Sequence, residues 1–194
     1  MSKIALTPNV SGTGTLTIAA PNTSTDRTLT LPDSTGTIDT LGRAGNVLQV
    51  VQAVKTNRES WSMAGSGTYY DISGLSASIT PSSASNKIIV RFDIGAFGLS
   101  SSVDALFRIV RDSTVIGIGD SGVTYPSTTA HRTRANELES ISGSTYIDSP
   151  STTSAVTYKI QWSSPSAVSA TINCRTSSNV FGAISTITLM EIAA

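Results

Sequence analysis

The chain has 194 residues, and its 13 Lys and Arg residues balance 13 Asp and Glu residues. This zero net charge favours neither nucleic acid nor an anionic membrane as a partner, because both attract positively charged surfaces. A single Cys and a single His exclude an internal disulfide framework and a CxxC zinc site, and no run reaches the ~20 apolar residues needed to cross a bilayer. We therefore expect no cofactor, no metal, no membrane insertion, and synthesis in a cytoplasm.

Residues 13–38 alternate like a β-strand but contain few large apolar side chains. Ordering the backbone costs roughly 1–2 kcal/mol per residue, whereas burying a large apolar side chain returns at most about 1.5–3 kcal/mol. The segment is therefore not expected to fold alone, and its low net charge and many β-branched residues argue against disorder. We expect other copies of the chain, or another protein, to order it. The candidate contacts are Leu16, Ile18, Leu29, Leu31 and Ile38.

From residue 47 onward, short runs rich in β-branched and aromatic residues alternate with clusters of Gly, Ser, Pro and Asn. The predicted strands are 47–56, 67–72, 75–80, 87–98, 105–112, 114–119, 144–149, 155–163, 168–175 and 185–192. This spacing predicts an all-β fold, with an antiparallel β-sandwich or jelly roll at 47–194 preceded by an extended segment at 1–46. The only helix-like run, NVLQVVQAVK, is dense in Val and is predicted to be a strand.

Three stretches show how the strands are expected to use their faces. In KIIVRFDIGAF (87–97), every second residue from Ile88 to Ile94 is apolar, which is the period of a half-buried strand. The terminal run STITLMEI (185–192) has apolar residues on both faces, so we expect it to be covered on both. In FRIVRDSTVIGIG, the turn residues at 112–113 separate two apolar runs and predict a hairpin.

The run GTGTLTIAAPNTSTDRTLTLPDSTGTI (12–38) resembles the N-terminal segments of many bacteriophage fibre and appendage proteins, where such a stretch precedes a β-rich tip. GRAGNVLQVVQAVKT (42–56), GLSASITPSSASNKIIV (74–90) and STITLMEIAA (185–194) are similar to elements of the globular domains that follow those segments. The resemblance implies a virion protein, a homotrimer whose N-terminal part serves attachment or forms a stalk and whose jelly-roll tip is exposed. Because the chain is short, the resemblance favours a short fibre, a spike or a capsid decoration protein over a long tail fibre.

The candidate surface-binding loop contains Tyr125, His131, Arg132 and Arg134. The last three lie in TTAHRTRANE, a short basic loop in an otherwise neutral chain. The alternatives are a solvated loop or subunit contact, or three copies that meet near an axis and bind an anion or a metal. Aromatic residues that would either stack on a sugar ring or pack in the core or an interface are Trp61, Trp162, Tyr69, Tyr70, Tyr125 and Tyr146. Tyr125, in a loop rich in Pro and Ser, is the best exposed candidate among them.

No catalytic residue is predicted. Glu137 and Glu139 would share a strand face, as the paired carboxylates of a glycoside hydrolase can, but two nearby arginines favour a surface ion-pair cluster. The run GIGDSG (117–122) matches a phosphate-binding glycine motif, but no helix is predicted after it, so we expect a turn. Cys174 is expected to be a small buried hydrophobic residue.

The sequence therefore predicts a non-enzymatic structural protein of the virion, assembled in the host cytoplasm, that functions as a short trimeric fibre or spike. Its expected partners are its own copies, other virion proteins through the N-terminal segment, and a host surface glycan or receptor. The alternatives are a capsid decoration or cement protein that stabilises the head and, from another class, a glycan-degrading spike enzyme that uses Glu137 or Glu139.

Overall fold

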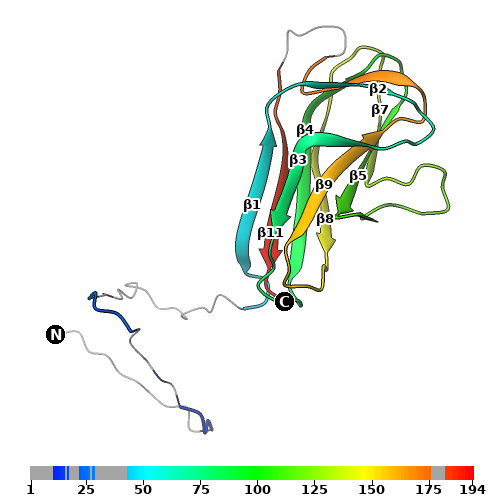
Figure 1. Ribbon diagram of the computed structural model, residues 1–194. Helices are drawn as coiled ribbons and strands as arrows, with labels where there is room; N and C mark the ends of the chain where they lie inside the picture. Colours follow the sequence, from blue (N-terminus) through cyan, green and yellow to red (C-terminus); the bar gives the residue numbers. More distant parts are fainter. Residues whose placement is uncertain (1–10, 16, 18–21, 27, 29–42, 176–181) are drawn as a thin grey trace. The chain divides into compact units, whose positions relative to one another are not determined.

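The computed structural model describes residues 11–15, 17, 22–26, 28, 43–175 and 182–194 (Figure 1). The chain divides into two units, Met1–Ile38 and Asp39–Ala194. The described residues of the first unit are exposed and form neither strand nor helix. The candidate contacts of this segment, Leu16, Ile18, Leu29, Leu31 and Ile38, lie outside the described residues.

The second unit is all-β over its described residues, which form eleven strands and no helix. The strands are β1 (Val47–Lys55), β2 (Glu59–Met63), β3 (Tyr70–Ile79), β4 (Lys87–Leu99), β5 (Asp104–Arg111), β6 (Thr114–Ile116), β7 (Thr129–Arg132), β8 (Glu139–Asp148), β9 (Val156–Ser163), β10 (Val168–Ile172) and β11 (Ser185–Ile192). All of the pairings between them are antiparallel, and they form two sheets, here called sheet A and sheet B.

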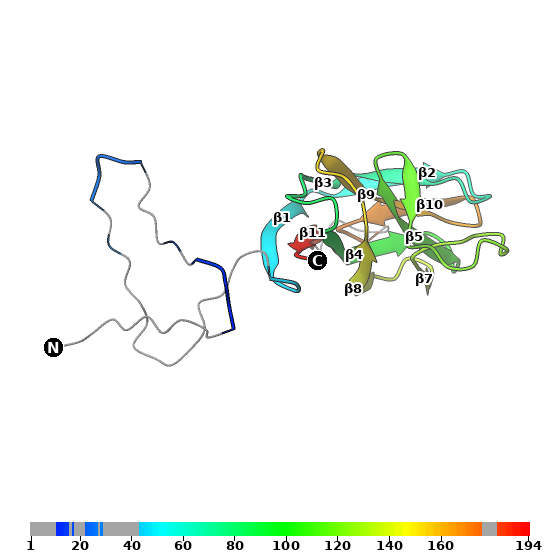
Figure 2. The ribbon, with the colours of Figure 1, turned by 90° about the horizontal axis from the view of Figure 1, so that it is seen from below.

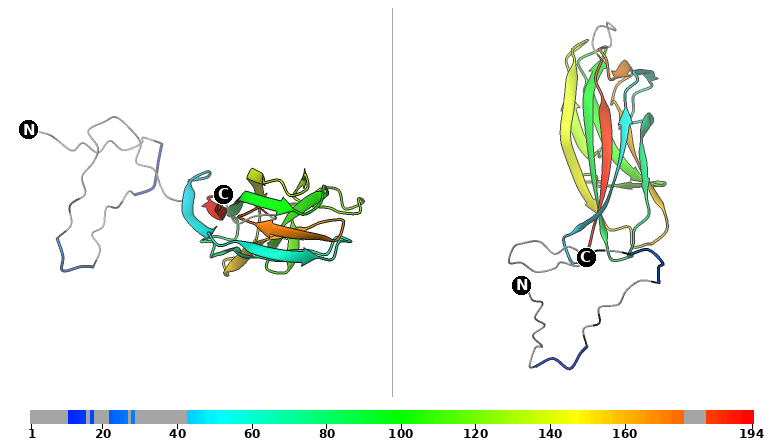
Figure 3. Two further views of the ribbon diagram at one scale, coloured as in Figure 1. Left: turned by 90° about the horizontal axis from the view of Figure 1, so that it is seen from above. Right: turned by 90° about the vertical axis from the view of Figure 1, so that its left-hand side faces the viewer.

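Sheet A is built around the long strand β4, which has β8 on one side. The other side of β4 is shared by two strands: β11 pairs with Lys87–Asp93, and β10 pairs with Phe97–Leu99. Next to them, β1 pairs with β11 and β2 pairs with β10. In the right-hand panel of Figure 3, β8, β4, β11 and β1 follow one another across one face of the unit.

Sheet B contains β3, β9 and β5 in that order, and two short strands share the outer side of β5. β6 pairs with the Arg111 end of β5, and β7 pairs with the Asp104 end. Seen from below in Figure 2, the two sheets face each other. Buried side chains from both sheets form one shared core, which is the arrangement of a β-sandwich.

The pairings are nested along the chain, so strands from opposite ends lie side by side. β1 pairs with β11, β3 with β9, β4 with β8, and β5 with β6 and β7. Two further pairings, β11 with β4 and β9 with β5, join these pairs into the two sheets. The strand β11 is therefore an internal strand of sheet A, between β1 and β4.

The core confirms the two-residue period predicted for β4. Its inward residues Ile88, Val90, Phe92 and Ile94 are fully buried, as expected for a strand with one face against a core. Aromatic rings extend this core between the sheets: Phe97 lies edge-on to Phe107 at 5.3 Å, Phe107 stacks on Trp162 at 5.8 Å, and Trp162 meets Trp61 edge-on at 4.9 Å.

Other predictions are also confirmed. The Val-rich run NVLQVVQAVK contains strand β1 rather than a helix. β5 and β6 form the predicted hairpin, and Asp112 in its turn has a positive φ of 51°, a conformation that Asp tolerates better than most residues.

Some predictions are corrected. The predicted strands 67–72 and 75–80 are one strand, β3, with a register shift between Asp71 and Ser76. Residues 129–132, predicted to be loop, form β7, because this polar stretch pairs with β5. The terminal strand β11 is covered on one face only, since Met190 and Ile192 on its outer face are half-buried.

Candidate functional site

The outer face of sheet B carries a set of polar and aromatic side chains that contact one another across three strands. We call this set the polar row; it consists of Tyr69, Asp71, Arg108, Lys159 and Gln161. β3 and β9 alternate, with buried apolar residues toward the core and members of the polar row pointing outward. On β5, Arg108 points outward between Leu106 and Val110, which are buried. The polar outer face is thus the surface of β3 and β9, extended by Arg108.

The strand register places the centre of the polar row in line. Asp71 of β3 lies opposite Gln161 of β9, and Gln161 lies opposite Arg108 of β5. Gln161 Nε2 donates to Asp71 Oδ1 at 2.6 Å, and Arg108 Nε donates to Gln161 Oε1 at 2.8 Å. Lys159 Nζ donates to Asp71 Oδ2 at 2.8 Å and forms an ion pair with it. These bonds hold the planar groups of the row in a defined orientation.

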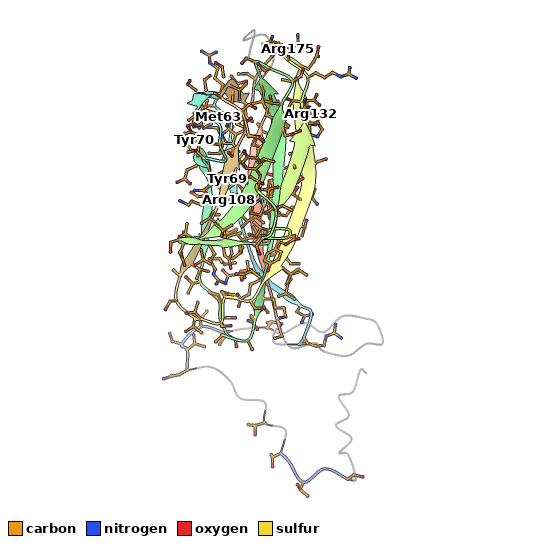
Figure 4. All side chains as sticks on the ribbon, turned by 90° about the vertical axis from the view of Figure 1, so that its right-hand side faces the viewer. Met63, Tyr69, Tyr70, Arg108, Arg132 and Arg175 are labelled. Carbon is orange, nitrogen blue, oxygen red and sulfur yellow. The ribbon has the colours of Figure 1, made fainter. Side chains whose placement is uncertain are left out.

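Tyr69 completes the polar row beside β5. The Arg108 guanidinium carbon lies 3.7 Å from the centroid of the Tyr69 ring, a cation–π contact, and Figure 4 shows the two residues next to each other. The Tyr69 hydroxyl donates to the carbonyl of Pro126, in the connection between β6 and β7, at 3.0 Å. Arg108 is therefore held between an aromatic ring and an amide and has little freedom to move.

Burial and neighbouring charged groups shift the pKa values of the polar row in opposite directions. Burial lowers the pKa of Arg108, which nevertheless remains a cation at neutral pH. The hydrogen bond from Lys159, with a further one from Gln161, lowers the pKa of Asp71 despite its partial burial. Burial raises the pKa of Tyr69, and the charge of Arg108 opposes that rise. In the described ranges of the chain, no carboxylate lies within ion-pair distance of Arg108. Gln161 bridges Asp71 to it, and the two charges also act on each other directly, which helps to lower the pKa of Asp71 and opposes the lowering of the pKa of Arg108.

The polar row can therefore bind a ligand that is rich in hydroxyl groups or carries an acidic group. Arg108 and Lys159 supply donors, Asp71 supplies acceptors, and Tyr69 supplies an aromatic surface beside them. A half-buried guanidinium without a carboxylate of its own favours an oxyanion ligand, which would offset the cost of its desolvation.

The candidate surface-binding loop does not form one site. Tyr125 lies in the connection between β6 and β7, half-buried, and its ring packs so close to Gly67 that a Cβ there would lie 2.9 Å from Tyr125 Cδ1. The next residue, Pro126, is the one that accepts the Tyr69 hydroxyl bond. Tyr125 therefore borders the polar row, which sequence reasoning did not connect with it.

The basic residues of that loop lie elsewhere. His131 of β7 faces β8, where its Nε2 lies 3.1 Å from Glu139 Oε2, and its ring lies 5.7 Å from that of Phe97. Arg132, on the opposite face of β7, is exposed and pairs loosely with Asp104 at 3.4 Å. Arg134 follows the strand and is exposed. Among the described residues, this arrangement links the edges of the two sheets rather than forming a basic patch.

The remaining candidates have structural surroundings. Glu139 begins β8, and Glu137 lies exposed in the turn before it. Cys174 is buried, as predicted for a small hydrophobic residue. Over the residues that the structure describes, no group of three His, Cys, Asp or Glu side chains is placed to hold a metal ion.

A buried ion pair joins the two sheets at the Arg111 end of β5, opposite to the end that pairs with β7. Arg111 Nη1 donates to both oxygens of Asp148 on β8, at 2.9 and 2.7 Å, and the hydroxyl of Tyr158 on β9 donates to Asp148 Oδ2 at 2.7 Å. Burial raises the pKa of Tyr158, and its hydrogen bond to Asp148 raises it further. All three side chains are mostly or fully buried, so the cluster ties sheet A to sheet B and is not open to a ligand.

Sequence reasoning found part of the polar row and missed the rest. Tyr69 was among the aromatic candidates, but Asp71, Arg108 and Gln161 were not considered. A local signal existed: a single charged or amide residue between apolar ones in ALFRIV and YKIQW marks an outward position on a half-buried strand. This local signal does not show that the three strands pair with one another, because Asp71, Arg108 and Gln161 are 37 or more positions apart in the sequence.

No protein-family model and no curated protein matches this chain. Over the described ranges, there is no helix with the length and apolar character needed to cross a membrane. A function for the chain has to follow from its sequence, its fold and the polar row.

Proposed function

We propose that the chain is a structural protein of a bacteriophage particle, a short homotrimeric fibre or spike. In this proposal, the N-terminal segment (1–46) attaches the protein to the particle, and the β-sandwich is displayed and binds the host surface. The observation that carries the proposal is the polar row, a preorganised and partly exposed set of planar polar groups on an otherwise hydroxyl-rich sandwich. The resemblance of residues 12–38 to the N-terminal segments of phage appendages supports the virion context.

We further propose that the sandwich is a jelly roll. The nested pairs support this, because a jelly roll is a long antiparallel hairpin rolled over on itself, so that first and last strands pair. Among the described residues, the buried members of the shared core lie between residues 63 and 189. In this proposal, the N-terminal segment attaches to other virion proteins or to its own copies.

The host ligand in this proposal is a surface glycan. Sugars present pairs of hydroxyl groups, which planar carboxylate, amide and guanidinium groups bind well, and the polar row supplies one of each in Asp71, Gln161 and Arg108. Tyr69 and the neighbouring Tyr125 add aromatic surface. In this proposal, the polar row binds the glycan and does not cleave it. Glu139, one of the two carboxylates considered for a glycan-degrading enzyme, is paired with His131.

Adsorption of the full chain to host cells or to their isolated envelope glycans tests the proposal. The variant Arg108→Gln removes the guanidinium of the polar row, and Arg134→Gln is a matched control because Arg134 is an exposed arginine outside the polar row. We expect the first variant to lose at least about tenfold in affinity, as for loss of a charged hydrogen bond, and the second to bind as the original chain does. Equal binding of both variants, or no adsorption of the original chain to any host preparation, would contradict it.

A capsid decoration protein is the second candidate. The short length and low charge of the chain favour it, because such a protein covers a neighbouring surface and needs no long stalk. This role predicts many copies per particle and heads that rupture more easily without the protein. Counting copies in images of intact particles separates the two roles, since a few trimers at the tail would leave only the fibre or spike.

A further inference from the structure

The outer face of sheet A carries a row of apolar side chains. The register places Ile147 of β8 opposite Ile89 of β4, Ile89 opposite Met190 of β11, and Met190 opposite Val50 of β1. At the end of β1, Val47 lies opposite Ile192. We call this set the apolar stripe; it consists of Val47, Val50, Ile89, Ile147, Met190 and Ile192. The four strands that carry it lie side by side in the right-hand panel of Figure 3.

The apolar stripe is open to solvent in the single chain. Val50, Ile147 and Val47 are 58%, 55% and 52% exposed, and the other three residues are half-buried. The adjacent row on the same face, two residues along each strand, is polar: Thr145, Arg91, Thr188 and Gln52. An apolar row that crosses four strands and then stops marks a bounded contact surface, because an exposed sheet face is otherwise expected to be polar.

We propose that the apolar stripe is the surface through which copies of this chain contact one another. Charge favours a second copy over a charged partner: the stripe contains no charge, and the two exposed cations beside it are already bonded within the chain. Lys87, opposite Ile192, donates to Ser149 Oγ at 3.0 Å, and Arg91 pairs with Asp93 on its own strand at 3.2 Å. The chain as a whole has zero net charge, so no long-range repulsion opposes self-association. Apolar surface on one copy is then complemented by the same kind of surface on another.

The size of the apolar stripe fits the centre of such a contact. Its exposed surface is on the order of 400 Å², in the range of the largest apolar patches on soluble proteins, which often serve in binding. A stable interface buries about 800 Å² on each partner, with an apolar centre and a polar rim. The rows of Thr, Gln and Arg beside the stripe can supply the rim. This inference rests on the homotrimer of the proposed function and names the surface that forms it, and it requires neither a virion nor a host ligand.

The mass of the full chain in solution, measured by light scattering over a range of concentrations, tests this proposal. The double variant Val50→Lys, Ile147→Lys places one charge at each end of the row formed by Ile147, Ile89, Met190 and Val50. The matched control is Val123→Lys, because Val123 is also 52% exposed but lies between β6 and β7. The homotrimer of the proposed function, with the stripes of three copies in contact, predicts the mass of three chains for the original chain and the control; a dimer that the double variant dissociates would keep this interface and reject the homotrimer. The double variant is expected to associate at least about thirtyfold more weakly, because charges that would be buried at the centre of an interface cost more than the loss of one strong contact.

Two results would overturn the proposal: a monomeric original chain at every concentration, or a double variant that assembles like the control. Circular dichroism checks that each variant keeps its β signal. If the lysine variant does not fold, Val50→Thr with Ile147→Thr replaces it, because threonine keeps the strand while removing apolar surface, and a several-fold weaker association is then expected. Unchanged assembly of a folded threonine variant also overturns the proposal. An intact trimer that fails to adsorb to host cells would reject the host-binding role and leave this interface standing.

Discussion

The two outer faces of the sandwich are built by the same alternation and yet differ in chemistry. On sheet B, the outward positions carry the polar row, whose members bond to one another. On sheet A, part of the outward face carries the apolar stripe, which has no cover within the described chain. The difference teaches that the same alternation can build one face whose polar groups bond to one another and another whose apolar groups have no cover among the described residues.

Both outer faces depend on the contacts that hold sheet A against sheet B. The largest expected loss of stability therefore comes from removing the buried ion pair between the two sheets. Asp148→Ala leaves Arg111 without its buried carboxylate and removes the acceptor of the Tyr158 hydroxyl. Removing one partner of a buried ion pair costs about 3–5 kcal/mol, so urea unfolding should show a loss of that size.

The matched control for this change is Asp104→Ala, which breaks an exposed ion pair between Asp104 of β5 and Arg132 of the neighbouring strand β7. Exposed pairs contribute at most about 1 kcal/mol. Similar losses for Asp148→Ala and Asp104→Ala would show that the link between the sheets is not where the structure places it.

A smaller loss of stability is expected at acidic pH, and it arises from a buried carboxyl group in sheet A. Glu191 of β11 points inward and is fully buried, and it accepts bonds from Asn86, Gln49 and Ser82. Burial alone would raise the pKa of this carboxyl, but these hydrogen bonds outweigh it and lower the pKa to about 2 from an ordinary value near 4.5. The unfolded chain therefore binds this proton first as the pH falls.

Stability from Glu191 is consequently present above about pH 4.5 and is lost as the pH falls toward 2. The loss is on the order of 1–3 kcal/mol over that window. The variant Glu191→Gln should be less stable at pH 7 and should show a flatter stability curve between pH 5 and 2 than the original chain. Parallel curves for the two chains would mean that this carboxyl does not carry the acid sensitivity.

The smallest effect on stability is expected at the polar row. Asp71→Ala removes an exposed acceptor from Lys159 and Gln161, so the free energy of unfolding should fall by no more than about 1 kcal/mol. Host adsorption by the same variant should nevertheless decrease, because Gln161 and Arg108 lose the group that orients them. A large loss of stability with unchanged adsorption would make the polar row a structural feature and would remove the contrast between the faces.

Local pattern predicted most strands and few of their partners. The two-residue period from Ile88 to Ile94 depends only on neighbouring residues, and it predicted β4 correctly. The turn residues at 112–113 likewise predicted the hairpin of β5 and β6 correctly. β2 and β7 were not predicted, because ESWSM and TAHR are short and mostly polar. They form strands through pairing with β10 and β5. Tertiary pairing outweighs propensity in such short segments.

The functional surfaces show the same limit. The polar row joins residues of β3, β5 and β9, and only the register of those strands brings them into line. The apolar stripe was not predicted: the apolar residues on both faces of STITLMEI were taken to mean a strand covered on both faces. Among the described residues, only the inner face of β11 is fully covered, and the stripe becomes visible only when β8, β4, β11 and β1 are in register.

The central claim is that self-association covers sheet A and leaves sheet B open, and chemical labelling of both faces of the full chain tests it most directly. Met190 in the apolar stripe can be oxidised, Lys159 in the polar row can be acetylated, and mass spectrometry follows both as the chain is diluted until it dissociates. The account predicts that Met190 reacts slowly in the assembly and faster after dilution, while Lys159 reacts equally in both states. Equal reaction of Met190 in both states, or protection of Lys159 by assembly, would contradict it.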